Sequence, residues 1–245
     1  MLEIKDLKKK IGSRYITNGL NLKLPKNKMT VIIGRSGEGK SLLLKQIIGL
    51  IKPSSGKIIL ENIDILSLKD MERQEFLKDF GYVFQFAALL DSLTIYENIV
   101  LPIQELDYSE YHKKQLVLEK INQVNLSESV LEKYPSEISG GMRKRAGLAR
   151  TLMTNPKIIL YDEPTTGLDP VTTRVIHELM VETQKLGVTS LVISHDIEIF
   201  NYADYVAFLY EGKIIYFGEA KNIWDEENPY IKQFIRGLTK GPINN

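Results

Sequence analysis

The chain has 245 residues, of which 43% are hydrophobic and 26% are charged, a composition typical of one large globular domain or two modest ones. Lys and Arg number 32 against 31 Asp and Glu, and the resulting net charge of +1 gives no support for a nucleic-acid binder. The sequence contains no cysteine, which excludes disulfides, Cys-ligated zinc and thiol catalysis. No leader pattern and no apolar run near the ~18 residues that span a bilayer is visible, so we expect a soluble protein that reaches a membrane only through a partner.

Short apolar strands alternate with amphipathic helices along the first third of the chain, the pattern of an α/β domain around a mostly parallel sheet. We expect a buried strand over 29–33, then a glycine-rich turn and a helix over 40–48. The Pro-Ser-Ser-Gly segment 53–56 predicts a turn before a strand over 57–60. A further short strand is predicted over 81–84.

Strand signals then stop between 86 and 150, where helical periodicity takes over, most clearly over 109–124. This region is predicted to be a helical insertion in the sheet domain. The sheet pattern returns over 157–161 and 189–194. A Glu-Gly pair in the middle of 206–217 separates two apolar runs and predicts a hairpin.

A glycine-rich loop follows the first buried strand and matches G-x-x-x-x-G-K-[ST] at every position. Its glycines let backbone N–H groups curl around phosphates, and the following helix adds the positive end of its dipole. Lys40 is predicted to reach the β- and γ-phosphates, and the Ser41 hydroxyl to bind Mg²⁺. The candidate ATP-binding residues of this loop are Gly34, Arg35, Ser36, Gly37, Glu38, Gly39, Lys40 and Ser41. The motif indicates a nucleotide phosphate without saying which class of NTPase holds it.

Two adjacent carboxylates, Asp162 and Glu163, end the apolar run 158–161. A buried strand has no structural need for two neighbouring acids, because unpaired buried charge is costly. Taken alone, the pair fits a solvated strand end; together with the phosphate loop, it favours a catalytic site. We expect Asp162 to hold Mg²⁺ through its water shell and Glu163 to polarise the attacking water as a general base.

A second candidate anion site precedes a helix that is expected to end near residue 154. Ser139 is predicted to cap this helix, and Gly140 and Gly141 expose backbone N–H groups. One nucleotide does not need two cradles far apart in sequence, so the second is expected to close over ATP held by another copy of the chain. The alternative is an ordinary capped helix in which the basic residues 143–145 form a solvated face.

The stretch 139–145 resembles the signature motif of ABC-type ATPases, and other motifs of that family follow in order. Gln85 matches the Q-loop glutamine, which the resemblance implies to contact the ATP site and the Mg²⁺ shell and to relay to a membrane subunit. Asp169 belongs to a stretch similar to the D-loop, implied to line a dimer interface. His195 matches the switch histidine, implied to contact the γ-phosphate as a catalytic residue beside Glu163; read alone, it fits a surface position at a strand end.

The resemblance covers essentially the whole chain, 1–245, and implies an ATPase with ATP and Mg²⁺ as cofactors. The implied fold is an α/β P-loop NTPase (RecA-like) core with a mostly parallel sheet, an N-terminal antiparallel β part and an inserted helical subdomain. Its expected parts are the nucleotide-binding core over 1–85 and 151–228, the helical subdomain over 86–150, and a C-terminal helix and tail over 229–245. The implied metal-holding residues are Ser41, Gln85 and, through water, Asp162.

The N-terminal region departs from the family pattern. Members commonly have an aromatic residue that stacks on adenine just ahead of a glycine such as Gly12, whereas this chain has Lys8 to Ile11 there. Tyr15 is the nearest aromatic residue. Whether Tyr15 takes that role, and how strongly the site prefers ATP over GTP, the sequence leaves open.

Two stretches are similar to the ATPase subunit of Mla-type phospholipid transporters, which pair with a permease and a lipid-binding MCE-domain protein. The first is 84–94, followed by Glu97 and Asn98, and the second is the tail 233–237 followed by Gly-Pro-Ile at 241–243. The implied function is an ATP-hydrolysing subunit that dimerises around two ATP molecules and powers phospholipid movement. The implied location is peripheral, on the cytoplasmic face of the inner membrane.

The implied partners are a second copy of the chain, an integral membrane permease, an MCE-domain protein and a small cytoplasmic regulatory subunit, with no nucleic acid. The apolar segment 87–100 fits either core packing or a groove that receives a permease helix, and the sequence leaves both open. Alternative systems are lipoprotein release, amino-acid uptake and cell division. A soluble ABC ATPase of DNA repair or translation is disfavoured because no long coiled-coil insertion or second ATPase half is visible. Glu163 and His195 together disfavour a regulator that does not hydrolyse ATP.

Overall fold

A computed structural model describes residues 1–243 of the chain. The chain packs into two compact units, which are described separately. Unit 1 comprises Met1–Arg73 and the chain from Thr189 onward, and unit 2 comprises Gln74–Val188. Within the described residues, no helix has both the length and the apolar character needed to cross a membrane.

The parallel sheet of unit 1 is built from the apolar runs that the sequence marks as buried strands. β3 (Met29–Ile33) lies between β8 (Thr189–Ile193) and β9 (Tyr205–Tyr210), parallel to both. All five residues of β3 and all five of β8 are buried, as expected for a strand covered on both faces. The predicted strands over 29–33 and 189–194 are therefore confirmed.

The predicted hairpin near the C-terminus is also confirmed. β9 pairs antiparallel with β10 (Lys213–Glu219), and the turn consists of Glu211 and Gly212. Both turn residues have positive φ, 48° and 74°, as a type I′ turn requires. The backbone N–H of Asn18 donates to the Gly212 carbonyl at 2.9 Å, so this turn is tied to the N-terminal strands.

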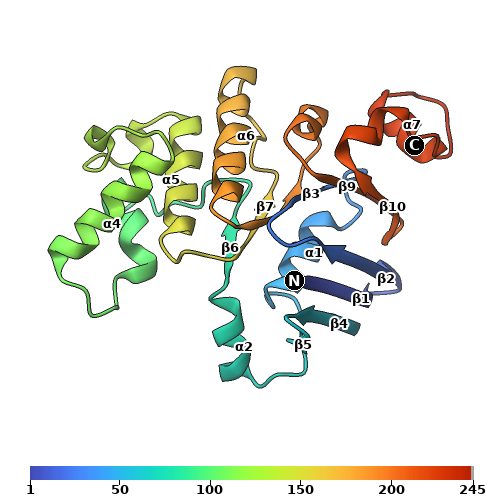
Figure 1. The fold of residues 1–245 in the computed structure, drawn as a ribbon, viewed down its shortest axis with the longest axis horizontal. Coiled ribbons are helices and arrows are strands. Elements are labelled where there is room, and N and C mark those ends of the chain that lie inside the picture. The colour runs from blue at the N-terminus through green and yellow to red at the C-terminus, as the bar shows by residue number, and fades with distance from the viewer. Residues whose placement is uncertain (244–245) are drawn as a thin grey trace. The chain divides into compact units, whose positions relative to one another are not determined.

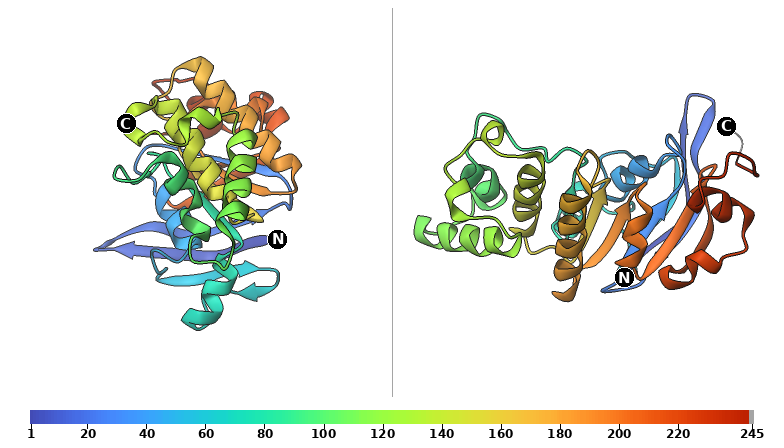
Figure 2. Two further views of the ribbon diagram at one scale, coloured as in Figure 1. Left: turned by 90° about the vertical axis from the view of Figure 1, so that its left-hand side faces the viewer. Right: turned by 90° about the horizontal axis from the view of Figure 1, so that it is seen from above.

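The N-terminal antiparallel part of unit 1 is a four-stranded sheet, as the family resemblance implies. Its order is β2–β1–β4–β5, with all neighbours antiparallel. Its strands are β1 (Leu2–Ile11), β2 (Arg14–Leu24), β4 (Ser55–Leu60) and β5 (Ile63–Asp64). β4 begins two residues earlier than the predicted 57–60. In unit 1, β2 and β10 lie side by side, which brings the blue N-terminal strands next to the red C-terminal ones (Figure 2).

The helices of unit 1 occupy the ends of these strands. α1 (Lys40–Ile47) follows β3 directly and confirms the helix predicted over 40–48. The 3₁₀ helices Ile197–Asn201 and Ala220–Asp225 precede and follow the hairpin, and α7 (Pro229–Ile235) ends the fold. The buried Gln233 amide accepts from the N–H of Ile243 at 2.7 Å and donates to its carbonyl at 3.0 Å, which fastens the tail to α7. Residues 244 and 245 of the predicted tail lie outside the described residues.

Unit 2 combines a pair of parallel strands with helices (Figure 1). β6 (Phe80–Val83) pairs in parallel with β7 (Ile158–Asp162), so β6 begins one residue before the predicted 81–84. The α-helices of this part are α3 (Ile95–Val100), α4 (Glu110–Gln123), α5 (Gly140–Leu152) and α6 (Pro170–Lys185); the short 3₁₀ turns are Leu101–Ile103, Glu128–Val130 and Pro135–Glu137. α2 (Asp70–Leu77) spans the boundary between the units. The segment 86–150 is helical and contains no strand, as predicted.

The compact units divide the chain differently from the predicted core and helical subdomain. The predicted boundaries at 85 and 150 follow the change from strand to helix periodicity. Unit 2 instead includes β6, β7 and α6, because α5 packs against β6 and β6 pairs with β7. Thr151 illustrates this packing: its hydroxyl donates to the Tyr82 carbonyl at 3.2 Å.

Candidate nucleotide-binding and catalytic residues

The predicted phosphate loop connects β3 to α1 in unit 1. Two of its glycines lie too close to neighbouring atoms to carry a side chain. Gly34 has φ +154°, and a Cβ there would lie 2.3 Å from the Leu209 carbonyl oxygen. Gly39 has φ +87°, and its Cβ would lie 2.4 Å from the Ile16 side chain. No larger residue fits at either position without displacing a neighbour, so the loop keeps its backbone tightly curled.

The start of α1 presents positive charge and backbone donors. Gly39 is the N-cap and makes no side-chain cap hydrogen bond, and the N-terminal end of a helix dipole attracts an anion. Lys40 is only 5% exposed, and its ammonium group donates to the carbonyls of Gly34 at 2.8 Å and Arg35 at 2.7 Å. Ser41 is the second residue of the same helix. This curled loop, with an ammonium group inside it, fits a polyphosphate.

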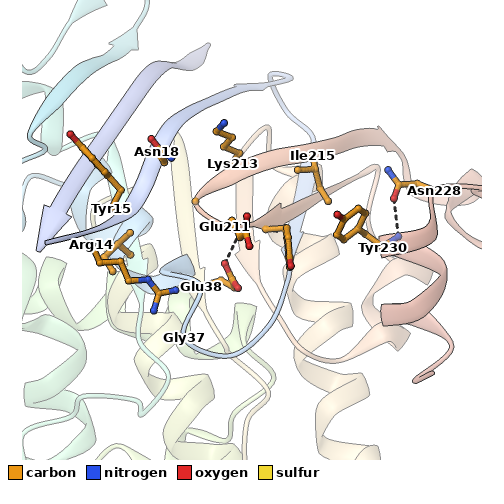
Figure 3. Close-up of a pocket in the computed structure, with 13 residues that line it drawn as sticks. Arg14, Tyr15, Asn18, Gly37, Glu38, Glu211, Lys213, Ile215, Asn228 and Tyr230 are labelled. Atoms are coloured by element: carbon orange, nitrogen blue, oxygen red, sulfur yellow. Dashed lines mark hydrogen bonds between the residues drawn. The ribbon is translucent and has the colours of Figure 1, made fainter. Parts of the chain in front are cut away.

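Glu38 has a structural role that the motif does not predict. Its carboxylate accepts from the backbone N–H of Glu211 at 2.7 Å, which ties the phosphate loop to the β9–β10 turn (Figure 3). The side chain is therefore engaged by the fold, and only the backbone of Glu38 remains as a candidate phosphate contact.

A cavity of about 610 Å³ lies beside the phosphate loop in unit 1. Residues of β2, the loop, the β9–β10 hairpin and the start of α7 line it. Arg14 points toward Gly37 of the loop, whereas the neighbouring Tyr15 ring points the other way (Figure 3). The Lys10 ammonium lies 5.7 Å from the centre of the Tyr15 ring, which is 46% exposed. Tyr15 is thus available to a planar ligand, and its contact with adenine stays a prediction.

His195 and the phosphate loop share one edge of the unit 1 sheet. β3 and β8 are parallel with Ile32 opposite Ile193, so the residues that follow each strand emerge at the same carboxyl edge. The Ser194 hydroxyl accepts from the N–H of Asp196 at 3.0 Å, which fixes the turn that contains His195. The imidazole is exposed. The contact of His195 with a terminal phosphate stays a prediction.

The two predicted acids lie at the end of β7 in unit 2, and each faces a different partner: Tyr82 in β6 and Gln85, two residues after β6. The Tyr82 hydroxyl donates to Asp162 at 2.9 Å, and the Gln85 amide donates to Glu163 at 3.3 Å. The Thr166 hydroxyl also donates to Glu163, at 3.1 Å. Burial raises the pKa of the Tyr82 phenol, and the negative charge of Asp162 adds to the shift, so the phenol stays protonated and remains a donor.

The sequence did not predict that Tyr82 and Thr166 donate hydrogen bonds to the two carboxylates. Tyr82 reads as an apolar strand residue, and only the parallel pairing of β6 with β7 brings its hydroxyl to Asp162. Thr166 falls inside the D-loop stretch, where its hydroxyl has no sequence signature of its own. The Tyr82 contact depends on strand register and the Thr166 contact on the geometry of the turn after β7.

The start of α5 confirms Ser139 as a helix cap. Its hydroxyl accepts from the N–H of Met142 at 3.2 Å. A Cβ on Gly141 would lie 2.4 Å from the Thr172 side chain, so the start of α5 packs closely on the start of α6. Asp169 caps α6 by accepting from the N–H of Thr172 at 3.0 Å and from its hydroxyl at 2.6 Å. The signature and D-loop stretches therefore meet within unit 2.

The basic run after these glycines is not a solvated face. Arg143 donates to the Pro135 and Ile138 carbonyls, and Arg145 donates to the Asn125 carbonyl. Lys144 donates to two carbonyls at 2.7 Å each, in the loop that follows the carboxylate pair. The alternative that treated 143–145 as a solvated face is therefore wrong, because each cation is used to hold a loop.

A strand, a glycine-rich loop and a helix with a buried lysine, accompanied by a strand that ends in two acids, define a P-loop nucleoside triphosphatase. A family model described as ABC transporter matches residues 17–166, and the chain belongs to this family. The protein is an ATPase that uses ATP and Mg²⁺. The oxygen donors Ser41, Gln85 and Asp162 suit a hard cation such as Mg²⁺.

Similar proteins cover nearly the whole chain. A probable ribonucleotide transport ATP-binding protein, mkl of Mycobacterium leprae, is 37% identical over 99% of this chain and 70% of its own length. The intermembrane phospholipid transport system ATP-binding protein MlaF of Haemophilus influenzae is 37% identical over 99% of this chain and 93% of its own length. A solved dimeric ATP-binding cassette in a post-hydrolysis state, bound to ADP and Pi, has a TM-score of 0.82 and 31% identity, covering 90% of this chain and 99% of that one.

Proposed function

We propose that this ATPase is the energy-supplying subunit of an ABC transporter that moves phospholipids. The observation that carries the proposal is the similarity to an MlaF protein over 93% of that protein's length. The stretch 84–94, which resembles Mla-type ATPases, also presents exposed apolar side chains in unit 2. In this function the chain itself contacts ATP and the permease, and not the lipid.

The proposed chemistry gives each of the predicted site residues one role. Lys40 and the backbone of the phosphate loop bind the β- and γ-phosphates, and Glu163 accepts the proton of the attacking water. His195 contacts the γ-phosphate. Ser41, Gln85 and, through water, Asp162 would hold Mg²⁺, which would supply positive charge to neutralise the phosphates.

The complete site requires a second copy of the chain. The backbone N–H groups of Ser139, Gly140 and Gly141 close over the nucleotide of the other copy, and Asp169 lies at the interface. A dimeric assembly of a similar cassette supports this proposal. ATP binding then joins the two copies, and hydrolysis releases them.

The permease docks on an exposed apolar surface of unit 2. Phe84, Phe86 and Leu90 are 39%, 77% and 47% exposed, which is unusual for large apolar side chains this close together in sequence. Asn98 is fully buried and holds the backbone of 90–94: its amide oxygen accepts from the N–H of Leu90, and its two amide hydrogens are shared among the carbonyls of Leu90, Leu93 and Thr94. A rigid apolar surface of this kind suits the apolar face of a permease helix.

The resemblance to Mla-type transporters supports two further partners. They are an MCE-domain lipid-binding protein and a small cytoplasmic regulatory subunit, with the ATPase on the cytoplasmic face of the inner membrane. The experiment is to purify the complex from membranes of the producing cells, to identify its subunits by mass spectrometry, and to measure ATP-dependent transfer of labelled phospholipid in proteoliposomes. We expect transfer that a Lys40→Ala subunit abolishes.

The docking surface is tested in the same preparation. Leu90→Asp is expected to release the permease while the isolated subunit still binds ATP. Leu106→Asp is the matched control, because Leu106 is 48% exposed in the same unit and outside the surface. A complex that transfers no phospholipid and whose permease has no MCE-domain companion would contradict the lipid cargo and favour a generic ABC importer.

A further inference from the structure

The Tyr82 hydroxyl is directed at the metal-holding carboxylate by the register of unit 2. β6 and β7 are parallel with Tyr82 opposite Leu160, two residues before Asp162. The long side chain of Tyr82 spans this offset, and its hydroxyl reaches Asp162 Oδ2 at 2.9 Å. A shorter side chain at this position would end before the carboxylate.

Tyr82 is held from both ends. Its carbonyl lies 3.2 Å from the Thr151 hydroxyl, whose one proton is shared with the Gly147 carbonyl at 3.0 Å, and this contact links the backbone of β6 to α5. Its ring packs on that of Phe84, with 4.5 Å between centroids. A Cβ on the preceding Gly81 would lie 2.5 Å from the Thr151 side chain, so β6 has no room to shift toward α5. The hydroxyl is therefore a preorganised donor.

Asp162 needs such a donor because it is only 7% exposed. A buried carboxylate is costly unless it accepts hydrogen bonds, and a bond to one oxygen also fixes the direction of the other lone pairs. Groups that orient a metal-holding side chain in this way typically change metal affinity or activity by about 10–100-fold when they are removed.

We propose that Tyr82 is a positioning residue for the Mg²⁺ site: its hydroxyl holds Asp162 in the orientation that binds the water shell of the metal. This inference rests on the proposed function. It deepens that function by proposing that the Tyr82 hydroxyl sets how much Mg²⁺ nucleotide binding requires. Tyr82 contacts neither the nucleotide nor the metal and acts through Asp162.

The test is Tyr82→Phe, which removes one oxygen and keeps the ring packing. Binding of a fluorescent ATP analogue is titrated against Mg²⁺, and again in EDTA. We expect the Mg²⁺ concentration for half-maximal enhancement of binding to rise about tenfold, with binding in EDTA unchanged. The half-saturating Mg²⁺ for hydrolysis should rise similarly, while kcat at saturating Mg²⁺ stays within about twofold of wild type. A merely structural loss would lower binding in EDTA as well.

Tyr96→Phe is the matched control, because Tyr96 is a half-buried tyrosine of α3 in the same unit. An unchanged or lowered Mg²⁺ requirement in Tyr82→Phe would overturn the inference. An Asp162→Ala background sharpens the test: there, Tyr82→Phe is expected to have no further effect, and an equal further effect would show that the hydroxyl acts elsewhere. If the wild type itself shows no Mg²⁺-dependent ATP binding, the proposed function fails before this inference is reached.

Discussion

Glu163 is held in a backbone conformation that few glutamates adopt. Its φ is 49°, in the left-handed region, where a residue other than glycine costs about 1–3 kcal/mol. Glu163 directly follows β7, and because successive side chains along a strand point to opposite faces, Asp162 and Glu163 face different partners although they are adjacent. Asp162 accepts from Tyr82, and Glu163 accepts from Gln85 and Thr166. The two neighbouring carboxylates therefore have separate proposed roles, Asp162 in holding Mg²⁺ and Glu163 as the general base.

Glu163→Gln is expected to preserve ATP binding and to abolish hydrolysis. The amide fills the same space and still accepts a hydrogen bond through its oxygen, but it does not take a proton from water. The expected loss in kcat is about 10²–10⁴-fold, with an ATP dissociation constant within about threefold of wild type. Phosphate release and equilibrium ATP binding, measured on the same preparation, check the prediction.

The control for this substitution is Glu61→Gln. Glu61 also has φ 49°, but it lies in the exposed turn between β4 and β5 of unit 1. The two variants therefore share the chemical change and the backbone conformation. Normal turnover in Glu163→Gln, or an equal loss in both variants, would contradict the role of Glu163 as the general base.

At the scale of the element, α5 is tied to its surroundings by three consecutive cations. Lys144 connects it to the loop after the carboxylate pair through the carbonyls of Pro164 and Thr166. Burial lowers the pKa of Lys144 to about 8, and the negative charge of Glu163 opposes that shift. The helix is thus held by a lysine that loses its proton near pH 8, a pH that ordinary buffers cover.

The Lys144 pKa predicts how stability varies with pH. The folded pKa of about 8 lies below the ordinary value of 10.5, so between these values the unfolded chain binds more protons than the folded one. The contribution of Lys144 to stability is therefore lowest below about pH 8 and rises as pH increases toward 10.5. Urea unfolding of wild type and Lys144→Met checks it: the difference in unfolding free energy should shift in favour of wild type across this window.

Lys221→Met serves as the control, because its ion pair with Glu219 raises the pKa of Lys221. The difference in unfolding free energy between wild type and Lys221→Met should not change in favour of wild type between pH 8 and 10.5. A flat profile for Lys144→Met, or the same profile for both variants, would contradict the depressed pKa of Lys144.

The elements were predictable where short-range signals decide the structure. The apolar run of β3, the loop pattern before α1 and the Glu211–Gly212 turn each specify their own local conformation, and all three are confirmed. The Tyr82–Asp162 contact and the carbonyl contacts of Lys144 were not predictable, because their partners lie 80 and about 20 positions away in sequence. Their positions depend on strand register and helix packing, which a single sequence does not reveal.

At the scale of the whole molecule, the chain has two helix starts suited to phosphate, and they lie in different units. α1 begins after Gly39 without a side-chain cap, and α5 begins after Ser139 with two glycines. If the second start completes the ATP site of another copy, activity depends on pairing of chains and not only on each chain's own ATP contacts. That dependence distinguishes the shared-site proposal from a self-sufficient monomer.

Ser139→Arg is expected to abolish hydrolysis while ATP binding to the single subunit changes by less than about threefold. The substitution removes the cap of α5 and places a bulky cation where the partner's nucleotide must approach. Loss of the cap alone costs about 0.5–2 kcal/mol of stability. Phosphate release, equilibrium ATP binding and sizing chromatography with Mg-ATP provide the measurements, made in the complex if the isolated subunit dimerises poorly.

Ser109→Arg is the matched control, because Ser109 caps α4 by accepting from the N–H of His112 at 3.2 Å, the same distance as the Ser139 cap. It should lose similar stability and keep its ATPase activity. Mixing Ser139→Arg with Lys40→Ala subunits gives a stricter test: a mixed dimer retains at most one intact composite site, formed by the phosphate loop of the first variant and the α5 start of the second. Activity that reappears only on mixing therefore requires that sites are shared between copies. Normal hydrolysis by Ser139→Arg alone would instead show that each chain completes its own site, and the shared-site proposal would be wrong.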